Sequence, residues 1–85
     1  MKKIVSLAHA KTSLLDGEIL VYKPLKGKVT FLVLKDENRI TLINDNLRYN
    51  ISFSELNDLL KENNVYIYEK DNDLEINHEF KKLIQ

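Results

Sequence analysis

Between residues 18 and 68 the chain is a succession of short apolar runs separated by a few turn-forming residues. Four runs rich in β-branched and aromatic residues favour strands, at residues 18–22, 29–35, 39–43 and 47–51. The connections at 36–38 and 44–46 are too short for a parallel crossover, which needs a dozen or more residues. The spacing therefore predicts an antiparallel meander.

One helix is expected directly after the fourth run. Ser52 and Glu55 have the spacing of a capping box, in which each side chain bonds to the other residue's backbone N–H. Apolar residues then recur at helical spacing and predict a helix from about 53 to 62, with a stripe that rests on the sheet: Phe53, Leu56, Leu59 and Leu60. A fifth strand is predicted at 65–68.

The two ends of the chain leave more than one interpretation open. Residues 3–15 fit either a helical stripe or a strand at 3–8 followed by an irregular segment, and we favour the strand. Asp16 and Gly17 then have the composition of a two-residue hairpin turn. Toward the other end, we expect a short strand at 74–77 that passes into a terminal helical turn.

These segments predict a single α+β domain spanning residues 1–85. Its antiparallel sheet has about five strands, with a curl toward a small barrel as one option, and one amphipathic helix packs on it. Because the chain has no cysteine, its core depends on apolar burial without disulfides. The core residues expected opposite the helix are Ile19, Val21, Phe31, Val33, Ile40, Leu42, Ile51, Val65 and Ile67.

No residue pattern indicates catalysis or metal binding. The chain has no phosphate-binding loop, no dinucleotide-binding glycine pattern, no nucleophile elbow and no thiol. Its two histidines, His9 and His78, lie outside metal-ligand spacings. We expect a protein that is not an enzyme and has no catalytic residues, no metal site and no cofactor.

Tyrosines suggest a protein-binding surface. Tyr66 and Tyr68 are two residues apart on a predicted strand, so both point to one face of the sheet. Tyrosine suits an interface because it offers a large contact area with a polar tip. We expect another protein to bind at Tyr66, Tyr68 and Tyr49; a homodimer through the same edge is a variant of this hypothesis.

A small nucleic-acid-binding domain is the alternative. Lys23, Lys26 and Lys28 crowd one loop next to aromatic residues, a combination that contacts phosphates and stacks bases. Arg39 and Arg48 extend this surface if the fold brings them to the same side. Thirteen basic residues balance thirteen acidic ones, however, so the total charge does not favour nucleic acid.

The location and role follow from these hypotheses. No stretch reaches the ~20 apolar residues of a membrane span, and the apolar run at the N-terminus is too short for a signal peptide. We expect a cytoplasmic protein that does not enter a membrane. The sequence favours a modulator, inhibitor or accessory subunit of a larger macromolecule, of the kind that phages and mobile elements encode.

Overall fold

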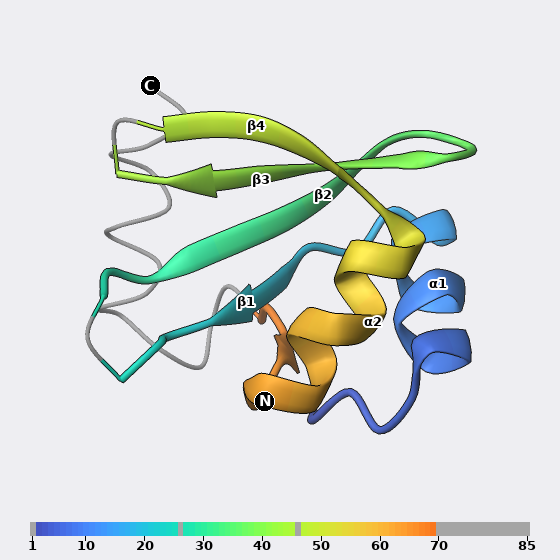
Figure 1. The fold of residues 1–85 in the computed structure, drawn as a ribbon. Helices are drawn as coiled ribbons and strands as arrows, with labels where there is room; N and C mark the ends of the chain where they lie inside the picture. The colour runs from blue at the N-terminus through green and yellow to red at the C-terminus, as the bar shows by residue number, and fades with distance from the viewer. Residues whose placement is uncertain (1, 26, 46, 70–85) are drawn as a thin grey trace.

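The computed structural model describes residues 2–25, 27–45 and 47–69 of the 85-residue chain (Figure 1). Two helices and five strands follow one another in the order α1 (Leu7–Leu15), β1 (Leu20–Tyr22), β2 (Thr30–Asp36), β3 (Arg39–Asn44), β4 (Leu47–Ser52), α2 (Phe53–Glu62) and β5 (Tyr66–Ile67). The strand expected at 74–77 lies outside the described residues.

The five strands form one antiparallel sheet in the order β4-β3-β2-β1-β5. Strands β1 to β4 make the predicted meander, and β5 returns after α2 to pair with β1 on the far side (Figure 1). The sheet is not closed into a barrel. The α+β class and the five antiparallel strands are therefore confirmed, and the barrel option is not.

Helix α2 begins and lies where its sequence predicts. The Glu55 N–H donates to the Ser52 hydroxyl at 3.1 Å, and the Ser52 N–H donates to the Glu55 carboxylate at 3.2 Å, which completes the capping box. Leu56 is fully buried, with Phe53, Leu59 and Leu60 packed around it against the sheet. The predicted stripe is confirmed.

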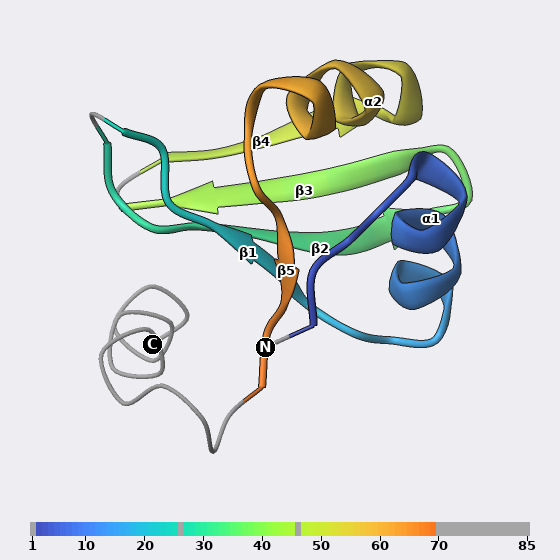
Figure 2. The same cartoon turned by 90° about the horizontal axis from the view of Figure 1, so that it is seen from below.

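Helix α1 begins at Leu7, so the predicted strand at 3–8 is wrong over its last two residues, whereas Lys3 forms an antiparallel bridge with Tyr66. Ser6 caps α1 by accepting the His9 N–H at 3.1 Å, and Ala10 and Leu14 turn into the core. The sequence of this segment fits both structures, and packing against α2 and the sheet favours the helical stripe (Figure 2).

Asp16 and Gly17 end this helix instead of forming a hairpin turn. Gly17 has φ +87°, the left-handed conformation that glycine adopts without strain. The Gly17 N–H donates to the Leu14 carbonyl and the Glu18 N–H to the Ser13 carbonyl, both at 3.0 Å. These two bonds form a Schellman motif, so the same glycine chemistry serves a helix C-terminus here.

Both faces of the sheet carry buried apolar residues, so the predicted core residues fall into two clusters, one on each face. The cluster on the helix side contains Ile4, Leu20 and Leu32. It also contains five of the predicted core residues, which are confirmed: Ile40, Leu42, Ile51, Val65 and Ile67. Ile19, Val21, Phe31 and Val33 belong instead to a second cluster on the opposite face, so they do not lie opposite the helix as expected. In an uninterrupted apolar run both alternating sets are apolar, and periodicity cannot say which set meets the helix.

Candidate functional site

The two edges of the described sheet differ. Residues 2–4 lie along β5: the Ile4 N–H donates to the Val65 carbonyl at 2.7 Å, and the Ile67 N–H donates to the Lys2 carbonyl at 2.7 Å. No described residue pairs with the outer side of β4, the last strand at the other edge. A strand at the edge of a sheet presents backbone donors and acceptors that another strand can use.

Strand β4 also carries exposed apolar side chains. Leu47 is 62% exposed and Tyr49 is 50% exposed. Tyr49 pairs with Leu42, whose side chain lies in the helix-side core, so Tyr49 points to the same side. Leu47 shares that side because it is two residues away. We call Leu47, Tyr49 and the outer side of β4 the β4 edge.

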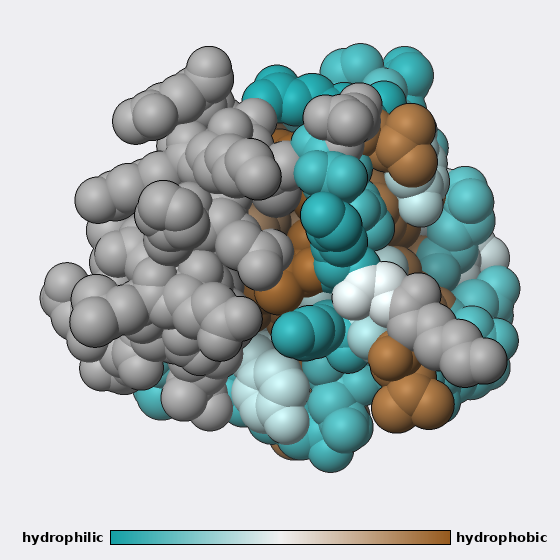
Figure 3. Space-filling view, turned by 90° about the vertical axis from the view of Figure 1, so that its left-hand side faces the viewer, coloured by the Kyte–Doolittle hydropathy of each residue, from teal (hydrophilic) through white to brown (hydrophobic). Residues whose placement is uncertain are grey.

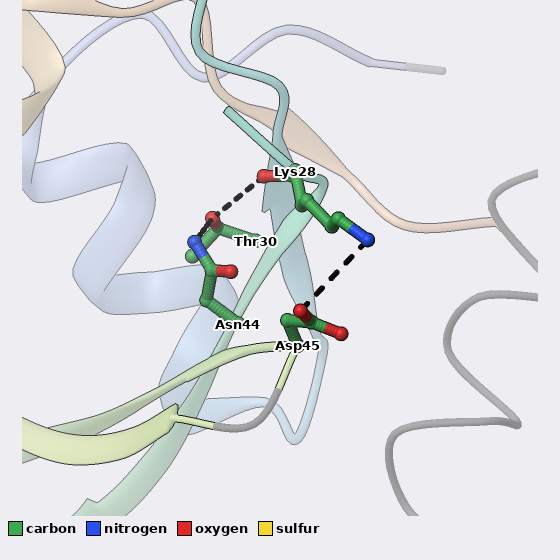
Figure 4. Close-up of polar contacts among 4 residues, drawn as sticks. All are labelled: Lys28, Thr30, Asn44 and Asp45. Carbon is green, nitrogen blue, oxygen red and sulfur yellow. Dashed lines mark hydrogen bonds and ion pairs between the residues drawn. The ribbon is translucent and has the colours of Figure 1, made fainter. Parts of the chain in front are cut away.

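A polar row supports this edge from the neighbouring strands. The Asn44 amide donates to the Thr30 hydroxyl at 2.9 Å, and that hydroxyl donates to the Lys28 carbonyl at 3.1 Å (Figure 4). Thr30 is fully buried, so these bonds satisfy a polar group that would otherwise lose its contact with water. Asn44 in turn pairs with Leu47, which fixes the start of β4.

Tyr22 lies at the end of the same row on β1, opposite Thr30. Burial raises the pKa of the Tyr22 hydroxyl above its ordinary value, the hydrogen bond with Thr30 lowers it, and the nearby Tyr49 hydroxyl raises it. The strand register places Tyr22 and Tyr49 on the same, helix-side face of the sheet. The helix-side face of the sheet therefore carries two tyrosines, Tyr49 on the edge strand β4 and Tyr22 on β1.

An open groove of about 340 Å³ follows between Tyr22 and α2. Its wall is formed by α2 and the residue that caps its C-terminus. The residues are three carboxylates and two uncharged side chains: Glu55, Asp58, Glu62, Leu59 and Asn63. Within the described residues, no three histidine or carboxylate side chains converge as metal ligands. The groove offers negative charge beside an aromatic surface, and no described group in it is arranged as a nucleophile with its base.

The three predicted tyrosines do not form one surface. Tyr66 and Tyr68 share the face opposite the helices, whereas Tyr49 lies on the helix side at the other edge of the sheet. Tyr68 is 8% exposed and packs edge-on against Phe31, with ring centroids 5.6 Å apart. The backbone edge next to Tyr66 is the one covered by residues 2–4.

The predicted basic residues are also dispersed. Lys28 lies 3.8 Å from Asp45 near one end of β3, and Arg39 lies 3.6 Å from Asp36 at the other end. Arg48 pairs with Ile43 and shares its face, opposite the helices. Lys23 is exposed beyond β1, and Lys26 lies outside the described residues. Lys23, Lys28 and Arg48 lie toward one end of the sheet, and Arg39 lies at the other.

Figure 3 looks at the end of the sheet where β1 and β3 end and β2 and β4 begin. Hydrophobic residues there form separate patches between hydrophilic ones among the coloured atoms.

Elsewhere, His9 accepts the Val5 N–H through Nδ1 at 3.2 Å, beside the start of α1. In the described ranges, no helix is long and apolar enough to cross a bilayer.

The sequence predicts Tyr49 as a binding residue but does not predict its place in the fold. In the run 47–52, apolar Leu47, Tyr49 and Ile51 alternate with polar residues, which is the pattern of a strand with one solvated side. That β4 lies at an edge depends on where β5 pairs, and local sequence carries no such signal. Comparison with protein-family models, with curated proteins and with solved structures gives no match.

Proposed function

We propose that this protein is a non-catalytic protein-binding module that acts as a modulator, inhibitor or accessory subunit of a larger protein. Its docking surface is the β4 edge. The observation that supports this proposal is the contrast between the two edges of the described sheet: residues 2–4 cover β5, while no other described strand pairs with the outer side of β4, which carries exposed Leu47 and Tyr49. Exposed apolar side chains on an edge strand suit strand addition.

In this mode an extended segment of the target adds a strand to β4. Backbone hydrogen bonds supply affinity, and alternating side chains supply specificity. Leu47 and Tyr49 provide the apolar contacts on the helix side. Strand β4 is held on β3 over its whole length and runs directly into the capping box of α2, so little backbone entropy remains to be lost on binding.

The contact should resist salt. Leu47 and Tyr49 are uncharged, and salt screens exposed charges without weakening apolar burial. Nucleic-acid binding predicts the opposite, because phosphate contacts release counterions and weaken steeply as salt rises. The dispersed basic residues described above supply no observation that favours this second function, and it enters the experiment as a contrasting outcome.

The test is affinity capture from cell extract at low concentration of the tagged chain, with and without nuclease, washed at low and then high salt. We expect a discrete protein that survives both treatments and is lost with Leu47→Lys. Val5→Lys is the matched control, since Val5 is 80% exposed and lies outside the sheet. Equal capture by wild type and Leu47→Lys would refute docking through the β4 edge, and nucleic acid released by salt would favour the alternative.

A further inference from the structure

We propose that residues 70–85 of this chain bind to the sheet face opposite the helices and bury it. We call this face the second face, and its buried apolar residues are Val21, Val29, Phe31, Ile43 and Tyr68. The inference goes beyond the proposed function and does not rest on it, because Leu47 and Tyr49 lie on the helix side. It assigns to the C-terminal segment a binding site on the chain's own sheet.

The second face is buried although no described helix or strand lies over it. Both helices contribute their buried residues to the cluster on the other side, through Ala10, Leu14 and Leu56. Phe31 is nevertheless fully buried, and Val21 and Ile43 are only 2% and 6% exposed. Side chains stand roughly perpendicular to a sheet, so neighbours on the same face shield their flanks but not their outer ends. A second layer is therefore needed to cover them.

The residues to be covered form a row across the sheet. Val21 pairs with Phe31 on one side and with Tyr66 on the other, and Phe31 pairs with Ile43. Tyr68 packs against the Phe31 ring, but Tyr68 is itself buried and needs cover as well. The cover therefore extends from β5 to β3, which is three strand spacings or roughly 14 Å.

The C-terminal segment starts beside this row. The Tyr68 N–H donates to the Ile19 carbonyl at 2.8 Å, which fixes the last described part of the chain next to the second face. The chain continues from Glu69 into residues 70–85, whereas everything else outside the described ranges is a single residue. Because the segment is attached to β5, its effective concentration at this face exceeds that of a separate protein.

The sequence of the segment has the apolar pattern that such a layer requires. Four apolar residues have helical spacing and share one side of a helix: Ile76, Phe80, Leu83 and Ile84. On the same helix, His78 and Lys82 fall on the opposite side. A helix over residues 76–85 is about 15 Å long, which matches the width of the row. The polar side of the segment then faces solvent.

The first experiment detects the contact in the unmodified chain. Nuclear Overhauser spectra of isotope-labelled protein should connect the Phe31 ring and the Ile43 methyl groups to Phe80 or Leu83. Leu42 is the matched control, because it is the neighbour of Ile43 in β3 but belongs to the helix-side cluster. Its methyl groups should show no contact with the segment. Absence of contacts to Phe31 and Ile43, or contacts to Leu42 instead, would overturn the inference.

A second experiment measures how exposed each face is. Because the chain has no cysteine, Ile43→Cys and Leu42→Cys each place a single thiol on a defined face. Adding Phe80→Asp should raise the rate of thiol labelling at position 43 by on the order of tenfold or more, since a carboxylate resists burial against an apolar face. Labelling at position 42 should stay unchanged. His78→Asp adds the same carboxylate to the polar side of the segment and should change neither rate.

Comparison of the two positions separates loss of the cover from general unfolding. A rise at position 43 alone supports binding of the segment to the second face. A rate at position 43 that does not respond to Phe80→Asp would contradict it. An equal rise at both positions would also count against it, because the segment would then not protect the second face selectively.

Discussion

At the scale of single residues, several turns and caps are built from local hydrogen bonds that need no tertiary partner. Asp36 illustrates this at the turn between β2 and β3. Its carboxylate accepts the Asn38 N–H at 2.9 Å and lies 3.6 Å from Arg39. The Asn38 bond is the main cause that holds the pKa of Asp36 below its ordinary value of 3.8, and Arg39 contributes in the same direction.

This shift predicts a pH effect with a defined sign. A depressed pKa in the folded state contributes stability above 3.8, the ordinary value, and the contribution is lost as the pH falls through the lower folded value. Asp36→Asn keeps an acceptor but not the charge. The difference in free energy of unfolding between wild type and this variant should be constant above about pH 5 and shrink in more acidic solution. Urea titrations across pH measure it, and a constant difference would contradict the assignment.

At the scale of elements, helix α1 depends on how it ends. Gly17 has φ +87°, and a Cβ at this position would meet nothing within 4 Å. The effect of a substitution is therefore backbone strain without a clash. The Schellman bonds to Leu14 and Ser13 require this conformation, which turns the chain from α1 toward β1.

We predict that Gly17→Ala destabilises the fold by roughly 1–2 kcal/mol, the penalty of the left-handed conformation for a residue with Cβ. Gly17→Asn should lose less, because asparagine tolerates this region better. Denaturant unfolding of the three proteins measures the order. An alanine variant as stable as wild type would show that the helix end rearranges at little cost.

At the scale of the whole molecule, the N-terminal segment and the β5 edge decide how many strands the sheet can accept. Ile4 is buried in the helix-side core and donates its N–H to Val65. Ile4→Pro removes that donor and weakens the cover over β5. Ile4→Val keeps the donor and most of the buried volume, so it is the matched control.

We predict that Ile4→Pro lowers stability and, at high concentration, assembles further than the wild type, because residues 2–4 then cover the β5 edge less well. Light scattering of both variants against wild type checks this. Ile4→Val should assemble as the wild type does. If Ile4→Pro assembles no further than wild type, residues 2–4 are not what limits the sheet.

Helices and strands could be predicted from the sequence where capping residues and apolar spacing indicate the same structure. Helix α2 has both a capping box at Ser52 and an apolar stripe around Leu56, and its predicted bounds match the structure. Residues 3–15 carry signals for helix and strand together, and glycine at position 17 suits a hairpin turn or a helix end. Such ambiguity is resolved by packing, which local pattern does not contain.

By itself, the sequence determined the α+β class, the antiparallel meander and α2, because period, turn length and capping act within a few residues. Tertiary structure alone decided which apolar set of β1 and β2 meets the helices, that β5 pairs with β1, and that residues 2–4 cover β5. These are contacts between distant segments, chosen by total burial. They separate Tyr49 from Tyr66 and place β4 at the other edge of the described sheet.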